Sequence, residues 1–322
     1  MQATQSLIWA VDLFGEDAKL QKKSAAFLNH LSRTLKTKVI PTYVLSPIPF
    51  LFRAIPEPTD GLKYRAETTD LRERLESWAK SFGVESIDKC EVLLSDDASV
   101  RSEVEVLIKF AEAENAQMIV LSTQARKGMG RFFLGSFAET LVLRSPVPLM
   151  LVQPTTKLAP QIKDILFPTD FSEKSKRSLV QVEVLALAMG ARIQLFHHLE
   201  YMTPSFTDMS LPKSRVEKLL KEMWGGTKRE KASAGKAWAD ELKQHGIACK
   251  FTLSDNPLFA VDDILAFSLK LKSGMIAISS QSKPGFAELI GGIARRVVRQ
   301  AQIPVWVVHP AEMAKAQVTA LI

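Results

Sequence analysis

The chain has 322 residues, of which 24% are charged and 46% hydrophobic, and its formal net charge is +7. This composition is typical of a globular protein with a buried core and excludes a disordered or fibrous chain. No apolar stretch approaches the roughly 20 residues that a membrane-spanning helix needs, so we expect no membrane partner.

In the first half of the chain, short apolar runs alternate with segments of helical periodicity. The runs predict strands at Leu7–Val11, Val39–Leu45, Cys90–Leu94, Met118–Leu121 and Val147–Val152. Apolar residues three or four positions apart predict helices over Asp17–Leu35, Thr69–Phe82 and Val100–Ala113, and from Gly135 onward. Strands that alternate with helices predict a parallel sheet with helices on both faces.

The second half repeats this pattern. Strands are predicted near 163–168, 192–198, 249–253, 275–279 and 303–308. The segment Val147–Pro154 corresponds to Ile303–Pro310, and Ile119–Ser122 corresponds to Ile276–Ser279. We expect the loops that follow Ser122 and Ser279 to be of equal length. Such landmarks, all in one order, indicate a tandem duplication of a whole domain, with domains at 1–156 and 157–322 and a joint at Pro154–Pro160.

Cysteine usage and the start of the chain bear on the compartment. Cys90 and Cys249 occupy equivalent places in the two repeats, so we expect two buried free thiols rather than a disulfide. No basic segment precedes the first apolar run, which argues against a signal peptide. Both features predict a cytoplasmic protein.

A basic stretch, Lys213–Lys243, raises the question of nucleic acid. Its lysines are interleaved with Glu217, Glu222 and Glu230, which favours a solvated helix face over a nucleic-acid surface. Two long connections, 46–62 and 201–211, are rich in apolar residues such as Phe50 and Phe52. We expect these loops to be covered, either by the protein itself or by a partner or apolar ligand, and we expect Phe50 and Phe52 to be packed.

Groups with binding chemistry are placed where the strands of the first repeat end. Asp12 follows the first strand, Val44 lies near the end of the second, and Ser122 ends the fourth. Ligands bind open parallel sheets outside the carboxyl ends of the strands, and a helix N-terminus such as that at Gly135-Ser136 attracts anions. Two interpretations remain open from the residues alone: an anion site, or an ordinary helix start with solvated basic side chains.

Several segments carry a resemblance to a known family. Ile165-Leu-Phe-Pro-Thr-Asp-Phe-Ser-Glu173, Ala188–His198 and the closing strands Pro148–Val152 and Pro304–Val308 resemble segments of the universal stress protein family. The resemblance covers nearly the whole chain, twice, and so indicates a tandem member. It implies an α/β fold with two open parallel five-stranded sheets of order 3-2-1-4-5, helices on both faces and a pseudo-twofold relation. It also implies that the two last strands pair within one chain, as they do across the family's homodimers; a further homodimer of this chain and an unknown protein partner stay open.

Nucleotide-binding members of this family carry G-x-x-G, nine residues, then G-[S/T] after the fourth strand, and an Asp after the first. In the first repeat Ser122 and Ala125 stand at the leading glycines, whereas Gly135 and Ser136 match. The resemblance implies that ATP, if bound, occupies the first repeat only. The candidate site residues are Asp12, Val44, Leu121, Ser122, Ala125, Arg126, Lys127, Gly128, Gly135, Ser136 and Phe137.

The second repeat departs further from the motif. Ser279, Ser282, Gly292 and Ile293 stand at the motif positions, and Pro284 removes a backbone donor from the loop. Asp170 is kept, and Leu199 is assigned to the adenine-contact position. We therefore expect this second site to have lost triphosphate binding.

Other chemistry has little support in the sequence. The five histidines show no metal-ligand spacing with the cysteines, and neither a nucleophile elbow nor a P-loop is present. We expect a non-enzymatic stress-response regulator that responds to a nucleotide. The alternative is a nucleotide-independent interaction module built as an internal dimer, and nucleotide hydrolysis ranks last.

Overall fold

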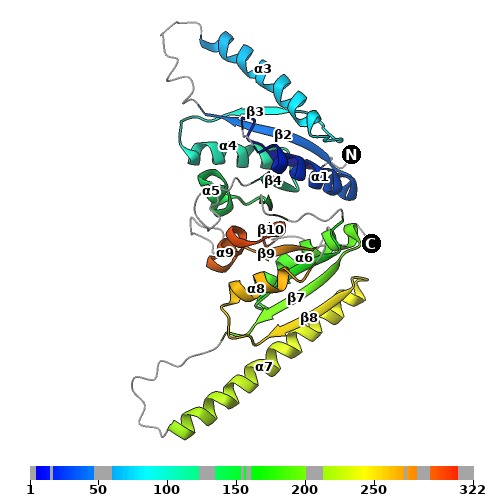
Figure 1. Cartoon of the computed structure of the whole chain (residues 1–322), viewed down its shortest axis with the longest axis vertical. Helices are drawn as coiled ribbons and strands as arrows, with labels where there is room; N and C mark the ends of the chain where they lie inside the picture. The colour runs from blue at the N-terminus through cyan, green and yellow to red at the C-terminus, as the bar shows by residue number, and fades with distance from the viewer. Residues whose placement is uncertain are drawn as a thin grey trace. The chain divides into compact units, whose positions relative to one another are not determined.

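A computed structural model of the chain describes residues 5–14, 17–46, 60–122, 135–153, 156, 161–200, 213–271, 274–280 and 291–310, with backbone only for 60–67 and 213–220 (Figure 1). The chain divides into two compact units. The first holds Met1–Gln161 with Ser280–His309, and the second holds Ile162–Ser279 with Pro310–Ile322. The last helix and last strand of the second repeat therefore belong to the first unit.

The first unit is a six-stranded sheet with helices on both faces. Its strands run in the order β3-β2-β1-β4-β5-β10. They are β1 (Ser6–Ala10), β2 (Lys38–Leu45), β3 (Glu91–Leu94), β4 (Met118–Ser122), β5 (Leu149–Val152) and β10 (Val305–Val308). The helices are α1 (Ala18–Leu35), α3 (Asp60–Ser81), α4 (Val100–Ala113), α5 (Ser136–Arg144) and α9 (Gly292–Gln300). The order 3-2-1-4-5 expected for a single repeat is confirmed.

The second unit holds the other four strands of the second repeat, in the order β9-β6-β7-β8. They are β6 (Asp164–Pro168), β7 (Arg192–His198), β8 (Cys249–Ser254) and β9 (Gly274–Ser279), and all their pairings are parallel. The helices are α6 (Glu173–Met189), α7 (Lys213–Gln244) and α8 (Ala260–Ser268). This order is the 4-1-2-3 part of the predicted topology.

Apolar runs form the strands, and capping residues set the ends of the helices. In β1 the side chains of Leu7, Ile8 and Trp9 are completely buried, as expected for a strand covered on both faces. Helix α1 begins where the Asp17 carboxylate accepts the Leu20 amide at 2.9 Å, and ends where Lys36 turns into the left-handed region. Right-handed crossovers in this strand order put α1 and α3 on one face and α4, packed against α5, on the other.

Helix α3 begins at Asp60, whereas the sequence pattern predicted a start at Thr69. The prediction missed the first turns because they contain few apolar residues and so show no helical periodicity. Most of the apolar connections 46–62 and 201–211, including Phe50 and Phe52, lie outside the described residues, as does nearly all of the joint Pro154–Pro160. The predicted free thiols are found: Cys90 is buried and Cys249 half-buried, and burial raises the pKa of both to about 11.

Strands β5 and β10 form the one antiparallel pair in the two described sheets. Met150 lies opposite Trp306 at the centre, with Leu149 opposite Val307 and Leu151 opposite Val305. Each of these strands is the last of its repeat, and every side chain in both is buried. The expected pairing of the last strands within one chain is thus present in the first unit.

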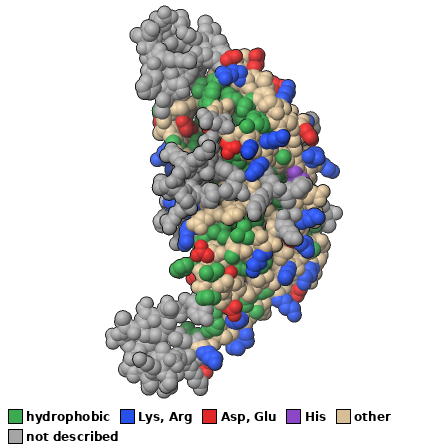
Figure 2. Space-filling view, in the orientation of Figure 1, with side chains coloured by type: hydrophobic (Ala, Val, Ile, Leu, Met, Phe, Trp, Pro, Cys, Tyr) green, Lys and Arg blue, Asp and Glu red, His purple; other side chains and the backbone are tan. Residues whose placement is uncertain are grey.

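Two basic side chains of α7 form close ion pairs with acidic partners. Lys228 Nζ lies 2.6 Å from Asp255 Oδ2, and Lys243 Nζ lies 2.9 Å from Asp240 Oδ1. On the face shown in Figure 2, Lys and Arg side chains are spread among other residues rather than gathered in one patch. Within the described residues, no helix is both long and apolar enough to cross a membrane.

Helix α7 packs closely against β8 at one glycine. A Cβ added to Gly235 would lie 2.2 Å from the ring of Phe251, which itself meets Phe171 edge-on at 5.7 Å. The same atom added to Gly226, also within α7, would meet no described atom within 4 Å. Of these two glycines, Gly235 is therefore the one that packing requires.

Gly235→Ala should destabilise the protein although alanine favours helix. Overpacking against Phe251 costs about 1–3 kcal/mol, which exceeds the ~1 kcal/mol of helix propensity that alanine gains. Gly226→Ala is the matched control and should be neutral or stabilising by about 0.5–1 kcal/mol. Urea unfolding of the two variants measures both values, and equal midpoints would contradict the packing argument.

His309, directly after β10, is half-buried in the first unit, and its Nε2 atom is shielded from solvent. Its Nδ1 lies 2.6 Å from Ser280 Oγ. Burial lowers the pKa of His309 from 6.5 to about 4, against the opposing effect of a hydrogen bond with the Val147 backbone. The folded protein therefore keeps this imidazole neutral at pH values where the unfolded chain protonates it.

Stability should consequently fall as pH drops from about 6.5 to about 4, because the unfolded state binds the proton first. The contribution of His309 over this window is on the order of 3 kcal/mol. His309→Gln, which introduces the residue found at the equivalent Gln153, should flatten that part of the pH dependence. Denaturant midpoints at pH 7.5 and 4.5 test this, and an unchanged difference between them would refute it.

Candidate functional site

The candidate site lies at the carboxyl ends of β1 and β4 in the first unit. These strands are neighbours, with Ala10 opposite Leu121, and the chain crosses to β2 on one side of β1 and to β4 on the other. Such a reversal of strand order opens a crevice where ligands bind. The fold thus brings Asp12 and Ser122 to the same edge of the sheet.

Asp12 is exposed, and its Oδ1 accepts the amide of Phe14 at 3.2 Å. A short side chain bonded to the backbone two residues on stabilises the turn that follows β1. This turn role does not compete with ligand binding, since a carboxylate offers about four acceptor sites. Asp12 is therefore placed both to shape the turn and to accept hydrogen bonds from a ligand.

Ser122 is tied to a helix that the sequence analysis did not connect with it. Its hydroxyl lies 2.6 Å from that of Ser24, a fully buried residue of α1. The second repeat has the same contact, at 2.6 Å between Ser279 and Ser178. The recurrence of serine at 24 and 178 was the available signal for this pair.

Helix α5 begins at a glycine with no side chain over its first turn. Gly135 is the N-cap, makes no side-chain capping bond, and a Cβ added to it would meet no described atom within 4 Å. The first amides of a helix have no partner within the helix and favour an anion. Ser136 is exposed beside them and Phe137 is half-buried.

The remaining candidates differ in what they can contribute. Val44 is half-buried in β2, opposite Leu93. The side chain of Leu121 is 2% exposed, so it contributes to the core rather than to an open surface. Ala125, Arg126, Lys127 and Gly128 lie outside the described residues.

The backbone register corrects two assignments in the second repeat. Thr42 lies opposite Ala10, and Phe196 lies opposite Pro168, so the counterpart of Val44 is His198 rather than Leu199. Gly291, not Gly292, is the N-cap of α9 and thus the counterpart of Gly135. The loop between Ser279 and Gly291 is one residue shorter than the loop between Ser122 and Gly135. The sequence alignment missed this difference because two adjacent glycines, Gly291 and Gly292, can each be matched to Gly135.

His198 forms a buried polar contact with Asp263. Its Nδ1 lies 2.8 Å from Asp263 Oδ2, and the two side chains are 6% and 8% exposed. Asp263 is the fourth residue of α8, and Glu103 holds the same place in α4. In the first repeat burial raises the pKa of Glu103, and the Ser46 hydroxyl partly offsets this rise.

Asp170, the counterpart of Asp12, accepts two hydrogen bonds at the start of α6. Its Oδ1 accepts both the Ser172 amide at 2.9 Å and the Ser175 hydroxyl at 2.7 Å. Burial raises the pKa of Asp170, but these hydrogen bonds outweigh burial and hold the pKa below its usual value. The carboxylate is therefore committed to starting α6.

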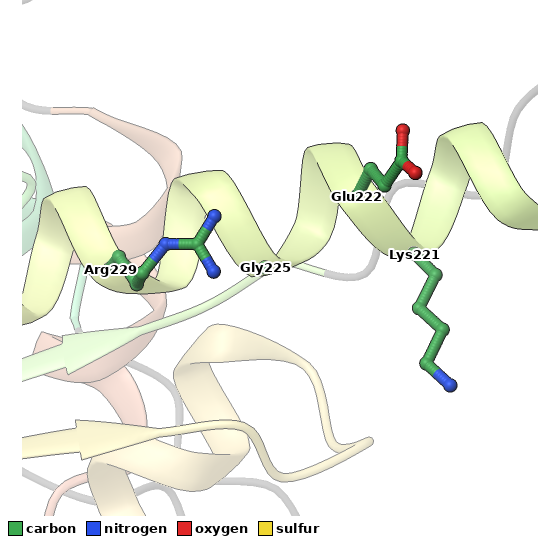
Figure 3. A pocket seen from close by; sticks show the side chains of 4 residues that line it. All are labelled: Lys221, Glu222, Gly225 and Arg229. Carbon is green, nitrogen blue, oxygen red and sulfur yellow. The ribbon is translucent and has the colours of Figure 1, made fainter.

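A surface hollow of about 400 Å³ lies along α7. Lys221, Glu222, Gly225 and Arg229 line it, and all four belong to the one helix (Figure 3). Lys221 and Arg229 are exposed, and no described residue of another element lines the hollow. It brings together no catalytic or ligand-binding constellation. Within the described ranges, no three His, Cys, Asp or Glu side chains converge as a metal site.

Comparison with known proteins gives the family. The model of the universal stress protein family matches residues 7–153 and again 161–309. The chain belongs to the universal stress protein family. It carries two copies of the family's domain, as the resemblance implied.

Solved structures agree with this universal stress protein fold. A universal stress protein from Archaeoglobus fulgidus DSM 4304 matches with a TM-score of 0.60 and 17% identity, over 97% of this chain and all of its own. A functionally unknown protein from Pseudomonas aeruginosa PAO1 matches with a TM-score of 0.58 and 14% identity, over 99% of this chain and 97% of its own. At such identities the likeness concerns the fold alone. A comparison with curated protein sequences gave no significant match.

The Ser24–Ser122 contact should stabilise the first unit. Ser24→Ala should cost about 1 kcal/mol or more, because it removes a buried hydroxyl from its partner. Ser24→Ala with Ser122→Ala should cost less than the two single changes summed, since neither hydroxyl is then left alone. Chemical denaturation of the three variants gives the coupling, and strict additivity would show that the contact contributes nothing.

Proposed function

We propose that this universal stress protein is a cytoplasmic stress-response regulator that binds an adenine nucleotide, ATP or a close relative, in its first repeat and does so without substantial catalysis. The observation that carries the proposal is the edge where β1 and β4 end. Asp12 follows β1 and Ser122 ends the adjacent β4, and α5, whose N-cap Gly135 makes no side-chain capping bond, connects β4 to β5.

Each end of the nucleotide has a suitable counterpart in this arrangement. The first amides of α5 and the exposed Ser136 hydroxyl suit phosphate oxygens, which accept hydrogen bonds and carry negative charge. The carboxylate of Asp12 suits ribose hydroxyls, and half-buried Val44 suits the apolar face of a base. Arg126 and Lys127, in the segment between Ser122 and Gly135, add positive charge for the phosphates.

The second repeat supports an assignment of one nucleotide per chain. At the position equivalent to Val44, the second repeat has His198, which forms a buried polar pair with Asp263. Asp170 is already bonded by Ser172 and Ser175, and α9 starts with Gly292 where α5 has the hydroxyl of Ser136. Each of these differences removes a contact that the first repeat offers.

Calorimetric titration of ATP into purified protein tests the proposal. Ser136→Ala should weaken binding by about tenfold or more, since a charge-assisted hydrogen bond contributes roughly 1.5–3 kcal/mol. Gly135→Val should abolish binding, because its side chain fills the open space before α5. Gly291→Val is the matched control at the equivalent N-cap and should leave affinity unchanged.

A different function is favoured by one specific observation. The Ser122 hydroxyl is already bonded to Ser24, and Ser122 and Ala125 add Cβ atoms where nucleotide-binding relatives have glycine. These features suit a nucleotide-independent interaction module. Undetectable binding at millimolar ATP, together with no nucleotide released on denaturation as judged by mass spectrometry, would reject the first function and favour this alternative.

A further inference from the structure

An ion cluster joins two helices that occupy the same place in the two repeats. Both α5 and α9 lie in the first unit, and each has nine residues and a glycine N-cap. The Glu139 carboxylate of α5 accepts a hydrogen bond from Arg299 of α9 and lies 3.0 Å from Arg295 Nη2. The three side chains are 28–37% exposed, so solvent screens this cluster only in part.

The charges at equivalent positions are opposite. Counted from the glycine caps, Glu139 and Arg295 are each the fourth residue of their helix, and Arg299 matches Leu143. The strands show that equivalent positions meet: Met150 and Trp306, each fifteen residues after its cap, lie opposite one another in the β5–β10 pair. An association of two first repeats through these elements would therefore oppose Glu139 with another Glu139. An association of two second repeats would bring Arg295 against Arg295 and Arg299.

The β5–β10 strand pair contributes affinity but does not discriminate between like and unlike repeats. The side chains of β5 and β10 are apolar and buried, so they suit a like or an unlike partner almost equally. One further polar pair is unlike: Gln153 and His309 are each eighteen residues after their caps. Gln153 donates to the Val298 carbonyl, whereas His309 is bonded to the Val147 backbone.

We propose that Glu139, Arg295 and Arg299 select the pairing of a first repeat with a second repeat and disfavour pairing of like repeats from two copies of the chain. The partner that fits the α5–β5 surface is thus the α9–β10 surface, recognised by opposite charge at equivalent positions. Like-charge opposition penalises the wrong partner, and the apolar strands then stabilise whichever pairing the charges permit.

The test uses the full chain, folded intact, with a protease site introduced within residues 157–160 and cut after folding. The two fragments of the nicked protein are mixed with an excess of isotopically labelled nicked protein and left to exchange. Native mass spectrometry then counts like and unlike fragment pairs. Wild type should remain in unlike pairs, with an unlike-to-like ratio at least roughly tenfold above that of the triple variant Glu139→Gln, Arg295→Gln, Arg299→Gln.

Charge reversal separates selectivity from simple loss of stability. In the uncut chain, Glu139→Arg should lower Tm by about 2–4 °C, and adding Arg295→Glu and Arg299→Glu should recover most of that loss. Arg296→Glu, an equal charge change on the exposed side of α9, is the control and should leave both Tm and the pairing ratio unchanged. A neutral triple variant that keeps the wild-type ratio, or a reversed variant that recovers no Tm, would overturn the proposal.

Discussion

The antiparallel pairing of β5 with β10 is the interaction on which the first unit depends. A last strand at a sheet edge leaves a row of backbone donors and acceptors without partners, and an apolar strand cannot leave them to water without exposing its side chains. Here β5 gains β10 as its neighbour, and the side chains of Leu149, Met150, Leu151 and Val152 are completely buried. Because β5 also pairs with β4, with Val152 opposite Ser122, this pairing also supports the carboxyl end of β4, where Ser122 lies.

The two repeats share a frame but have diverged where their strands end. Both keep an Asp after the first strand and a serine–serine contact from the first helix to the fourth strand. In the first repeat the neighbouring positions stay open, at Gly135 and Ser136. In the second, the buried pair of His198 with Asp263 supplies structure in place of a binding surface. The proposed nucleotide site therefore falls in the first repeat, whereas the second repeat uses the equivalent positions for internal contacts.

Much of this frame was predictable because it rests on hydrophobic periodicity. The buried strands β1 and β4 appear in the sequence as apolar runs, and recurring segments revealed the duplication. The start of α3 was not predictable in this way, since a helix that lacks an apolar stripe shows no period. The assignments of Leu199 and Gly292 were wrong by one residue, because backbone pairing rather than residue similarity sets the register. Contacts between side chains distant in sequence, such as Ser24 with Ser122, required coordinates.

The membership of β10 in the first unit has a consequence for how the chain is made. The amino-terminal repeat contains a strand whose neighbour lies 156 residues later, since Val152 ends β5 and Val308 ends β10. At a synthesis rate of 5–20 residues per second, the apolar edge of β5 waits about 10–30 s on the ribosome before β10 emerges. During translation the nascent chain therefore presents an open strand edge to chaperones and to neighbouring nascent chains.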